Sequence, residues 1–212
     1  ADPKAVNNEE HNALHLAALQ GHAQCIVPLV QAGVDPKAVT KDGDNAAHLA
    51  AIKGHVECIA PLVQAGVDPK AFDYYGRNAL HLAARNGHAE CFAPLLKAGV
   101  DPKAVDRHGW NALHHAVNNG HVQCIAPLVQ AGIDPKAVGK DGRNALHLAA
   151  WNGYVQCIAP LVEAGVNPKA VNNAGETAMS KAASDSFKAE LRKVCPMQEI
   201  HFPNGIIIAN EV

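Results

Sequence analysis

The chain repeats itself every 33 residues, and this period constrains its fold more than any other feature. The phrase "DYYGRNALHLAARNGH" at residues 73–88 returns as "DRHGWNALHHAVNNGH" at 106–121 and as "GKDGRNALHLAAWNGY" at 139–154. A unit of this length cannot bury its own apolar face, so neighbouring units must stack. The period therefore predicts a solenoid with units 1–33, 34–66, 67–99, 100–132, 133–165 and 166–198, followed by a tail at 199–212.

Each full unit has the pattern of a loop, a helix, a turn and a second helix, and the third unit shows it clearly. Its loop, "DPKAFDYYGR", contains Pro69, which has no amide hydrogen, and Gly76, which marks a turn. Asn78 stands where a helix N-cap is expected, before "ALHLAA", and an Asn-Gly pair ending at Gly87 closes that helix. The apolar spacing predicts a second helix over residues 89–98.

These features resemble the ankyrin repeat family. The matching motifs are "G-x-N-A-L-H-L-A-A-x-N-G-H" and "L-V-x-A-G-V-D", repeated at a period of 33. The likeness is strong over residues 1–183 and weaker over the second helix of the sixth unit. It implies an all-α ankyrin-repeat solenoid of six helix-turn-helix units with projecting β-turn fingers. In such arrays the finger tips and the exposed face of the first helix line a concave groove that binds partners.

Five prolines fall inside the second helices, beyond their first turns. They are Pro28, Pro61, Pro94, Pro127 and Pro160. A proline in a helix interior has no N–H to donate and its ring clashes with the preceding turn, which costs roughly 3 kcal/mol. We therefore expect a local distortion of the second helix in each of these units.

The two ends of the array differ from its middle. The first unit has Glu10 where the other fingers have glycine, so we expect a further repeat or cap upstream. The sixth unit replaces the helix histidine by Ser180 and adds charged residues, as a solvent-facing capping unit requires. In the tail, residues 203–205 predict a turn before an apolar run. The sequence leaves open whether this tail packs on the last unit or leads into another domain.

The six cysteines do not have the pattern of a disulfide framework. Five of them are 33 residues apart: Cys25, Cys58, Cys91, Cys124 and Cys157. Equivalent positions in stacked units lie about 10 Å apart, which is too far for a disulfide. We interpret the row as small buried hydrophobic residues in a reducing compartment. This predicts a cytoplasmic location and leaves secretion into a host cell open.

The chemistry-bearing residues give no pattern of an enzyme or a metal site. The chain has 13 histidines, most of them in two repeated columns rather than converging on one helix face. Four residues beyond His114 and His115 stand Asn118 and Asn119, so no pair of histidines at helical spacing is formed there. There is no phosphate-binding glycine loop, nucleophile elbow or HExxH motif. We expect a non-enzymatic protein without a metal or a cofactor.

Nucleic acids and membranes are also poor matches. Each finger carries a lysine directly after its proline, from Lys4 to Lys169, but nearly all of these lysines stand two residues from an aspartate. The net charge is −2, whereas a groove that binds phosphates should be clearly basic. We interpret the lysines as a solubilising row of paired charges. The apolar segments are shorter than the roughly 20 residues that a membrane span needs.

The units differ from one another mainly in the fingers and at the ends of the first helices. Both tryptophans and two of the three tyrosines fall at these variable positions in the third to fifth units. Tryptophan, tyrosine and arginine are the residues most enriched at binding hot spots. The predicted partner-binding residues are Tyr74, Tyr75, Arg77, Arg85, His108, Trp110, His115, Asn118, Arg143, Trp151 and Tyr154. The alternative is that these loops vary freely.

We therefore expect a monomeric protein-protein interaction module that binds a partner protein of unknown identity through the groove and finger tips of repeats 3 to 5. The alternative is a targeting arm of a larger enzyme or effector protein whose catalytic domain is absent from this sequence. An artificial scaffold is a third interpretation, suggested by the likeness of the copies, although the irregular tail argues against it.

Overall fold

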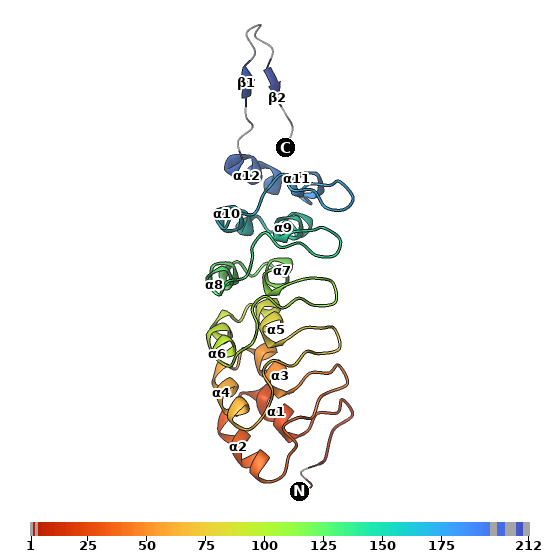
Figure 1. The fold of residues 1–212 in the computed structure, drawn as a ribbon, viewed down its shortest axis with the longest axis vertical. Helices are drawn as coiled ribbons and strands as arrows, with labels where there is room; N and C mark the ends of the chain where they lie inside the picture. The colour runs from red at the N-terminus through yellow and green to blue at the C-terminus, as the bar shows by residue number, and fades with distance from the viewer. Residues whose placement is uncertain (1, 3, 196–198, 202–206, 210–212) are drawn as a thin grey trace.

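The computed structural model places the helices in six consecutive pairs that stack along one axis (Figure 1). It describes residue 2 and residues 4–195, 199–201 and 207–209. In each unit the first helix lies between the second helix and the finger, so the fingers form one edge of the array (Figure 1). The predicted helical solenoid is confirmed. In the described part of the chain, no helix is long and apolar enough to cross a membrane.

The helix pairs follow the predicted units closely. They are α1 (Ala13–Gln20) with α2 (Ala23–Gln31), α3 (Ala46–Lys53) with α4 (Val56–Gln64), α5 (Ala79–Asn86) with α6 (Phe92–Lys97), α7 (Ala112–Asn118) with α8 (Ile125–Gln130), α9 (Ala145–Asn152) with α10 (Ile158–Glu163), and α11 (Ala178–Lys181) with α12 (Asp185–Val194). Short 3-10 turns, Ala89–Cys91, Val122–Cys124 and Val155–Cys157, precede α6, α8 and α10.

Each of the first five units starts its first helix at an asparagine and a histidine that cap one another. In the third unit, the Asn78 side chain accepts the backbone N–H of His81 at 3.1 Å. The backbone N–H of Asn78 in turn donates to His81 Nδ1 at 3.2 Å. This reciprocal arrangement satisfies two backbone groups at the helix start. Gly87, at φ 81°, ends α5 in the left-handed region that glycine adopts without a steric penalty.

The same histidines connect neighbouring units. His81 Nε2 lies 3.1 Å from the carbonyl oxygen of Ala104 in the next finger, and His48 Nε2 lies 2.9 Å from that of Ala71. Because Nδ1 accepts the N–H of the capping asparagine, we assign the hydrogen to Nε2, which then donates to the carbonyl. In the first, second, third and fifth units the histidine therefore fixes both the helix start and the adjacent finger, whereas His114 Nε2 has no hydrogen-bond partner among the described residues.

The second helices of all five proline-containing units start with the same i to i+3 hydrogen bond. The Cys91 N–H donates to the His88 carbonyl at 3.1 Å, and the Cys25 and Cys58 N–H groups donate to the His22 and His55 carbonyls at 3.0 Å. In the third to fifth units this first turn is a separate 3-10 turn, whereas α2 and α4 are continuous helices that contain Pro28 and Pro61. The expected local distortion is thus a separate 3-10 turn in the third to fifth units and the tightened first bond alone in the first two. The exposed position of the residue four before each proline allows water to bond the freed carbonyl.

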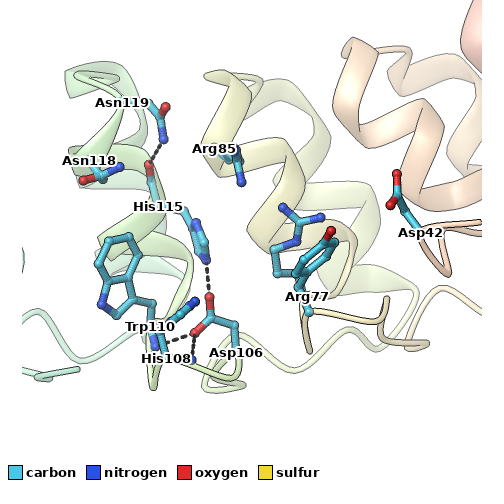
Figure 2. Close-up of a pocket in the computed structure, with 10 residues that line it drawn as sticks. Asp42, Arg77, Arg85, Asp106, His108, Trp110, His115, Asn118 and Asn119 are labelled. Atoms are coloured by element: carbon cyan, nitrogen blue, oxygen red, sulfur yellow. Dashed lines mark hydrogen bonds and ion pairs between the residues drawn. The ribbon is translucent and has the colours of Figure 1, made fainter. Parts of the chain in front are cut away.

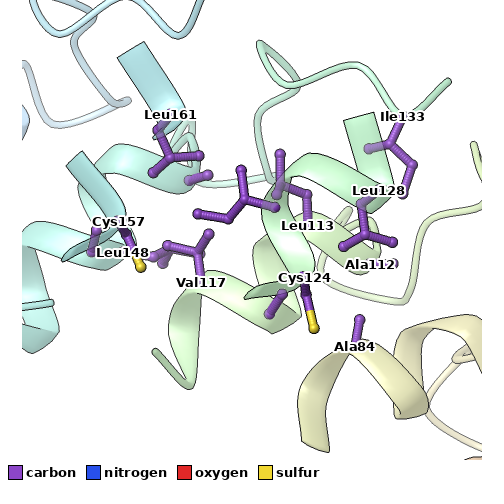
Figure 3. Packing of buried hydrophobic residues seen from close by; sticks show 14 of the residues in the cluster. Ala84, Ala112, Leu113, Val117, Cys124, Leu128, Ile133, Leu148, Cys157 and Leu161 are labelled. Carbon is purple, nitrogen blue, oxygen red and sulfur yellow. The ribbon is translucent and has the colours of Figure 1, made fainter. Parts of the chain in front are cut away.

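The core consists of two clusters of small and branched residues, one in the first two units and one mainly in the third to sixth, and Figure 3 shows part of the second. Alanines such as Ala84 and Ala116 are fully buried where successive first helices meet, which lets those helices approach closely. Leu113 and Leu128 are buried between the first and second helices of the fourth unit. Aromatic residues are scarce in this core, as the composition requires, and Phe92 and Phe187 are the largest side chains in it.

The sixth unit closes the described array with an amphipathic helix. Phe187 and Leu191 of α12 are fully buried, whereas Arg192 and Lys193 are exposed. This distribution agrees with the capping role predicted for the unit. In the tail, Glu199–His201 pairs in antiparallel fashion with Ile207–Ala209. The predicted turn at residues 203–205 lies outside the described residues.

The cysteine row divides into two classes. Cys58, Cys91, Cys124 and Cys157 are buried, as predicted, but Cys25 is exposed. The prediction for Cys25 is wrong because no unit of the described chain stacks on that face of the first unit. Burial raises the pKa of the Cys91 and Cys124 thiols to about 12 and that of the Cys58 and Cys157 thiols to about 11.

This arrangement predicts two accessible thiols in the native protein. Cys25 should react rapidly with a thiol reagent and the half-buried Cys195 more slowly. The four buried thiols should react only on unfolding, because they are inaccessible and protonated. Counting the modified thiols with time, in native buffer and in denaturant, measures the two classes. Cys25→Ser should remove the fastest phase, and rapid native labelling of more than two thiols would contradict the stacking.

Candidate functional site

The fingers of the third to fifth units are held rigidly by their own side chains and by each other. In the fourth finger, Asp106 Oδ1 accepts the backbone N–H groups of His108 at 2.8 Å and of Trp110 at 2.9 Å. Asp73 does the same in the third finger. The N–H of Arg107 donates to the Tyr75 carbonyl at 3.1 Å, which links the two fingers. These turns present the intervening side chains on one surface.

A pocket of about 590 Å³ lies between the second, third and fourth fingers and the helices α5 and α7 (Figure 2). We call the surface around it the groove, formed by residues 73–77, 85–86, 106–110, 115, 118–119, 139–143 and 151–152. The predicted residues that line the pocket are Tyr75, Arg77, Arg85, His108, Trp110, His115 and Asn118. Asp42, Asp106 and Asn119 also line it and were not among the predicted residues.

His115 lines this pocket, but its side chain is almost completely buried. It stands where neighbouring units have leucine, and it is only 5% exposed. Its Nε2 lies 3.0 Å from Asp106 Oδ2. Burial of Asp106 opposes its ionisation, but the His115 hydrogen bond and the finger N–H groups outweigh burial and lower the pKa of Asp106 to about 2. The histidine therefore fixes the carboxylate that organises the fourth finger.

Trp110 is half-buried and packs on both histidines of α7. Its ring stacks on His114 with centroids 6.2 Å apart and meets His115 edge-on at 5.6 Å. The Cδ1–Nε1 edge of the indole lies over Gly139 of the next finger, where an added Cβ would come within 2.8 Å of both atoms. Other fingers carry aspartate, asparagine or threonine at the position of Gly139. The three departures from the repeat, Trp110, His115 and Gly139, therefore belong to one packed cluster.

Two arginines from the third unit face the same pocket. Arg77 Nε binds Asp73 Oδ2 at 2.6 Å, and its guanidinium lies 4.7 Å from the centroid of the Tyr75 ring. Arg85, at the end of α5, is exposed and has no carboxylate within ion-pair distance among the described residues. The pocket thus combines one arginine held in place with one free arginine.

Trp151 lines a second pocket of about 260 Å³. Trp151 is 55% exposed and lies between two cations. The Arg143 guanidinium is 5.5 Å from its ring centroid and the Lys181 ammonium is 5.9 Å from it. Both cations are also paired, Arg143 with Asp141 at 3.2 Å and Lys181 with Glu176 at 2.6 Å. Trp151 and Arg143 were predicted, whereas the contribution of the sixth unit was not.

Two predicted residues lie outside both pockets. Tyr74 is 55% exposed at the tip of the third finger, over Gly43. Tyr154 is half-buried against the core and lies over Gly120 of the preceding unit. The histidines at the equivalent turn position occupy the same place over the preceding glycine, as His121 does over Gly87. Tyr154 therefore substitutes for a packing residue and does not face the groove.

The finger lysines are not paired as the sequence suggested. In the third finger, Asp68 accepts the backbone N–H of Lys70 at 2.9 Å, and its carboxylate does not bind the lysine ammonium. The other fingers repeat this turn. The Lys70 side chain instead extends over Gly99, near the end of α6, where a cation is favoured by the helix dipole. The expected row of paired charges is therefore wrong.

The second unit contributes a buried carboxylate where the third to fifth units carry arginine or tryptophan. Asp44 is 6% exposed, and its Oδ1 has no hydrogen-bond partner among the described residues. His48 Nδ1 lies 3.7 Å away, but it already accepts the N–H of Asn45. Burial, reinforced by the Asp73 carboxylate, raises the pKa of Asp44 to about 6.

Among the described residues, no group of three or more histidine, cysteine, aspartate or glutamate side chains is placed to hold a metal ion. The site offers aromatic rings, guanidinium groups and hydrogen-bonding amides instead.

Comparisons with known proteins agree with this architecture. The family model described as "Ankyrin repeats (3 copies)" matches residues 14–106 and 80–172. The chain belongs to the ankyrin repeat family. A search of curated proteins returned no match to the chain.

Among solved structures, 573 chains match this ankyrin repeat array. The ankyrin repeat domain of Bcl-3, a member of the IkappaB protein family, is 32% identical, with a TM-score of 0.75, over 90% of this chain and 86% of its own. The human ASB11 ankyrin repeat domain is 26% identical, with a TM-score of 0.83, over 92% of this chain and 87% of its own.

The two tryptophans should differ in their effect on stability. Trp110→Ala should lower the free energy of unfolding by about 1–2 kcal/mol, because it removes packing on His114 and His115. Trp151→Ala should change it by no more than about 0.5 kcal/mol, since that ring is mostly exposed. Urea denaturation of both variants measures the difference. Equal losses of stability in the two variants would show that Trp110 contributes no more packing to the fold than Trp151 does.

Asp44→Asn should stabilise the array at neutral pH. The folded pKa of Asp44 is raised above its unfolded value, so the protonated acid favours folding and the ionised form opposes it. Stability is therefore lost as pH rises through about 6. At pH near 7.5 the variant should gain about 2 kcal/mol over the parent, a gain that shrinks as pH falls towards 4. Denaturation of both proteins across this range tests it. Asp42→Asn, at an exposed carboxyl, is the control, and a gain independent of pH would contradict the assignment.

Proposed function

We propose that this ankyrin repeat array is a non-enzymatic, monomeric module that binds a partner protein through the groove of repeats 3 to 5. Ankyrin repeat domains are in general protein-protein interaction modules. The observation that carries the specific proposal is the joint placement of both tryptophans and three arginines in two pockets on the finger side of the array. The scaffold positions around them hardly vary between units.

The chemistry of the groove supports a protein ligand. Tyr75 and Trp151 are about half exposed, yet each ring is held by a neighbouring guanidinium at 4.7 and 5.5 Å. Such rigid aromatic residues lose little conformational entropy on binding, which suits them as anchors. The adjacent amides of Asn118 and Asn119 offer hydrogen bonds at the rim of the pocket. The reducing environment inferred from the buried thiols supports action in the cytoplasm.

A second candidate function is that of a targeting arm in a larger enzyme or effector protein. The groove would then select the substrate or location for a catalytic domain elsewhere in the protein. The same binding surface serves both functions, and the full reading frame distinguishes them: a folded catalytic domain adjoining residues 1–212 would favour the targeting arm.

Alanine substitution of the exposed anchors tests the proposal. A partner is first captured with the parent protein and identified, and its affinity for each variant is then measured by calorimetry. Tyr75→Ala and Trp151→Ala should each cost about 2 kcal/mol of binding, roughly a thirtyfold loss of affinity. Neither should move the denaturation midpoint appreciably, because both rings are largely exposed.

Lys41→Ala, on the exposed second finger, is the matched control and should leave the affinity unchanged. A loss of stability in Tyr75→Ala or Trp151→Ala would show that these rings are packing residues. Unchanged affinity in both would show that the partner binds another surface.

A further inference from the structure

We propose that the groove recognises an extended acidic segment of its partner, with a carboxylate bound between Arg77 and Arg85 and apolar side chains on Trp110 and Trp151. This inference rests on the proposed function and adds the chemistry of the ligand. The chain as a whole has a net charge of −2, so a positively charged surface requires cationic side chains to cluster in one place.

The carboxylates beside the pocket are largely occupied by internal contacts. Asp106 accepts two finger N–H groups and contacts His115, and Asp73 accepts two N–H groups and binds Arg77. Both carboxylates are buried, at 6% and 5% exposure. In the lining of the pocket, Asp42 at its edge is the acidic residue that remains exposed. The oxygens of Asp73 and Asp106 are thus held by contacts inside the protein, and Arg85 is the guanidinium of the pocket that has no carboxylate partner among the described residues.

The guanidinium groups, by contrast, keep hydrogen-bond donors available. Arg77 binds Asp73 through Nε, which leaves its two terminal nitrogens for another group. Arg85 has all of its donors free among the described contacts, and it projects from the end of α5 towards the same pocket (Figure 2). Two guanidinium groups facing one concave site favour a carboxylate, which each can bind through paired hydrogen bonds.

Comparison of the units shows which of them carries arginine at both positions. The finger position of Arg77 is occupied by Asp44 in the second unit and by Trp110 in the fourth. The helix-end position of Arg85 is occupied by Ile52 in the second unit. The arginine pair therefore exists only in the third unit, directly beside Trp110. A ligand with an acidic residue next to an apolar one matches this order.

The spacing of the units selects an extended ligand. Packed helices lie 8–10 Å apart, and an extended chain advances about 3.3 Å per residue, so about three residues span one unit. A segment of about ten residues can therefore place a carboxylate at the arginine pair, one apolar side chain on Trp110 and another on Trp151 in the next unit.

Selection from a displayed library of random peptides of about 12 residues tests this chemistry without an identified partner. The folded array is the bait, and Arg85→Glu and Lys97→Glu are the compared variants. Lys97 is exposed on α6 of the same unit and outside the groove, so its substitution changes the net charge equally. The parent and Lys97→Glu should select peptides rich in aspartate and glutamate, with aromatic or aliphatic residues about three positions away. Arg85→Glu should lose that preference.

The affinity of a synthetic peptide with the selected sequence is then measured for each variant, which gives the size of the effect of Arg85 on binding. Its affinity should fall about tenfold in Arg85→Glu and remain within about twofold in Lys97→Glu. Raising NaCl from about 0.05 to 0.3 M should weaken binding, as expected for an exposed charge contact. Replacing its acidic residues by amides should weaken it by a similar factor. A thymidine oligonucleotide of equal length should bind more weakly than the peptide.

Selection of basic or neutral peptides, failure to select any, or tighter binding of the oligonucleotide would each overturn the inference. The proposed function is tested separately by Tyr75→Ala and Trp151→Ala against the captured partner. If those variants lose the partner while the selected peptides are neutral or basic, the groove binds a protein but the acidic chemistry is wrong. If those variants keep the partner, both the proposed function and this inference fail.

Discussion

The contact on which the array depends is the pairing of an asparagine and a histidine at the start of the first helix in each of the first five units. Asn78 and His81 satisfy each other's backbone groups, and the ring then reaches the Ala104 carbonyl of the next finger at 3.1 Å. The contact works only with a neutral imidazole that accepts at Nδ1 and donates at Nε2. Burial, the largest influence, lowers the pKa of His15 and His81 to about 4, so the ring stays neutral at physiological pH.

This contact leaves other positions free to vary. Since the helix start, the finger base and the stacking distance are set by a few repeated side chains, the finger tips and helix ends need not contribute to the fold. The exception is the cluster of Trp110, His115 and Gly139, in which three substitutions accommodate one another. An aspartate in place of Gly139 would meet the indole, and a leucine in place of His115 would leave Asp106 without its imidazole partner. The pocket is thus built into the scaffold at this one point.

The sequence predicts well whatever depends on neighbours along the chain. The helix bounds of the third unit, the asparagine caps and the terminal glycines follow from local patterns. The structure reproduces these bounds within about one residue once the 3-10 turn Ala89–Cys91 is counted with α6, which itself begins at Phe92. The sequence predicts less well the features that depend on residues close in space but distant along the chain. Cys25 repeats a buried position, yet it is exposed because no described unit covers it. Tyr154 shares the composition of a hot spot, but its position in the turn places it against the core.

The groove itself was predictable in outline and not in detail. Variation between units identified the fingers and helix ends, and the pockets include nine of the eleven predicted residues. The sequence did not identify Asp42, Asp106 and Asn119 as residues that line the pocket. For the two aspartates the reason is that a carboxylate in a finger turn has the same sequence pattern whether it faces solvent or its own backbone. Only the hydrogen bonds of Asp73 and Asp106 distinguish these cases. The same turns explain how a chain with a net negative charge presents Arg85: Asp73 and Asp106 bind backbone N–H groups, Arg77 binds Asp73, and Arg85 has no carboxylate partner among the described residues.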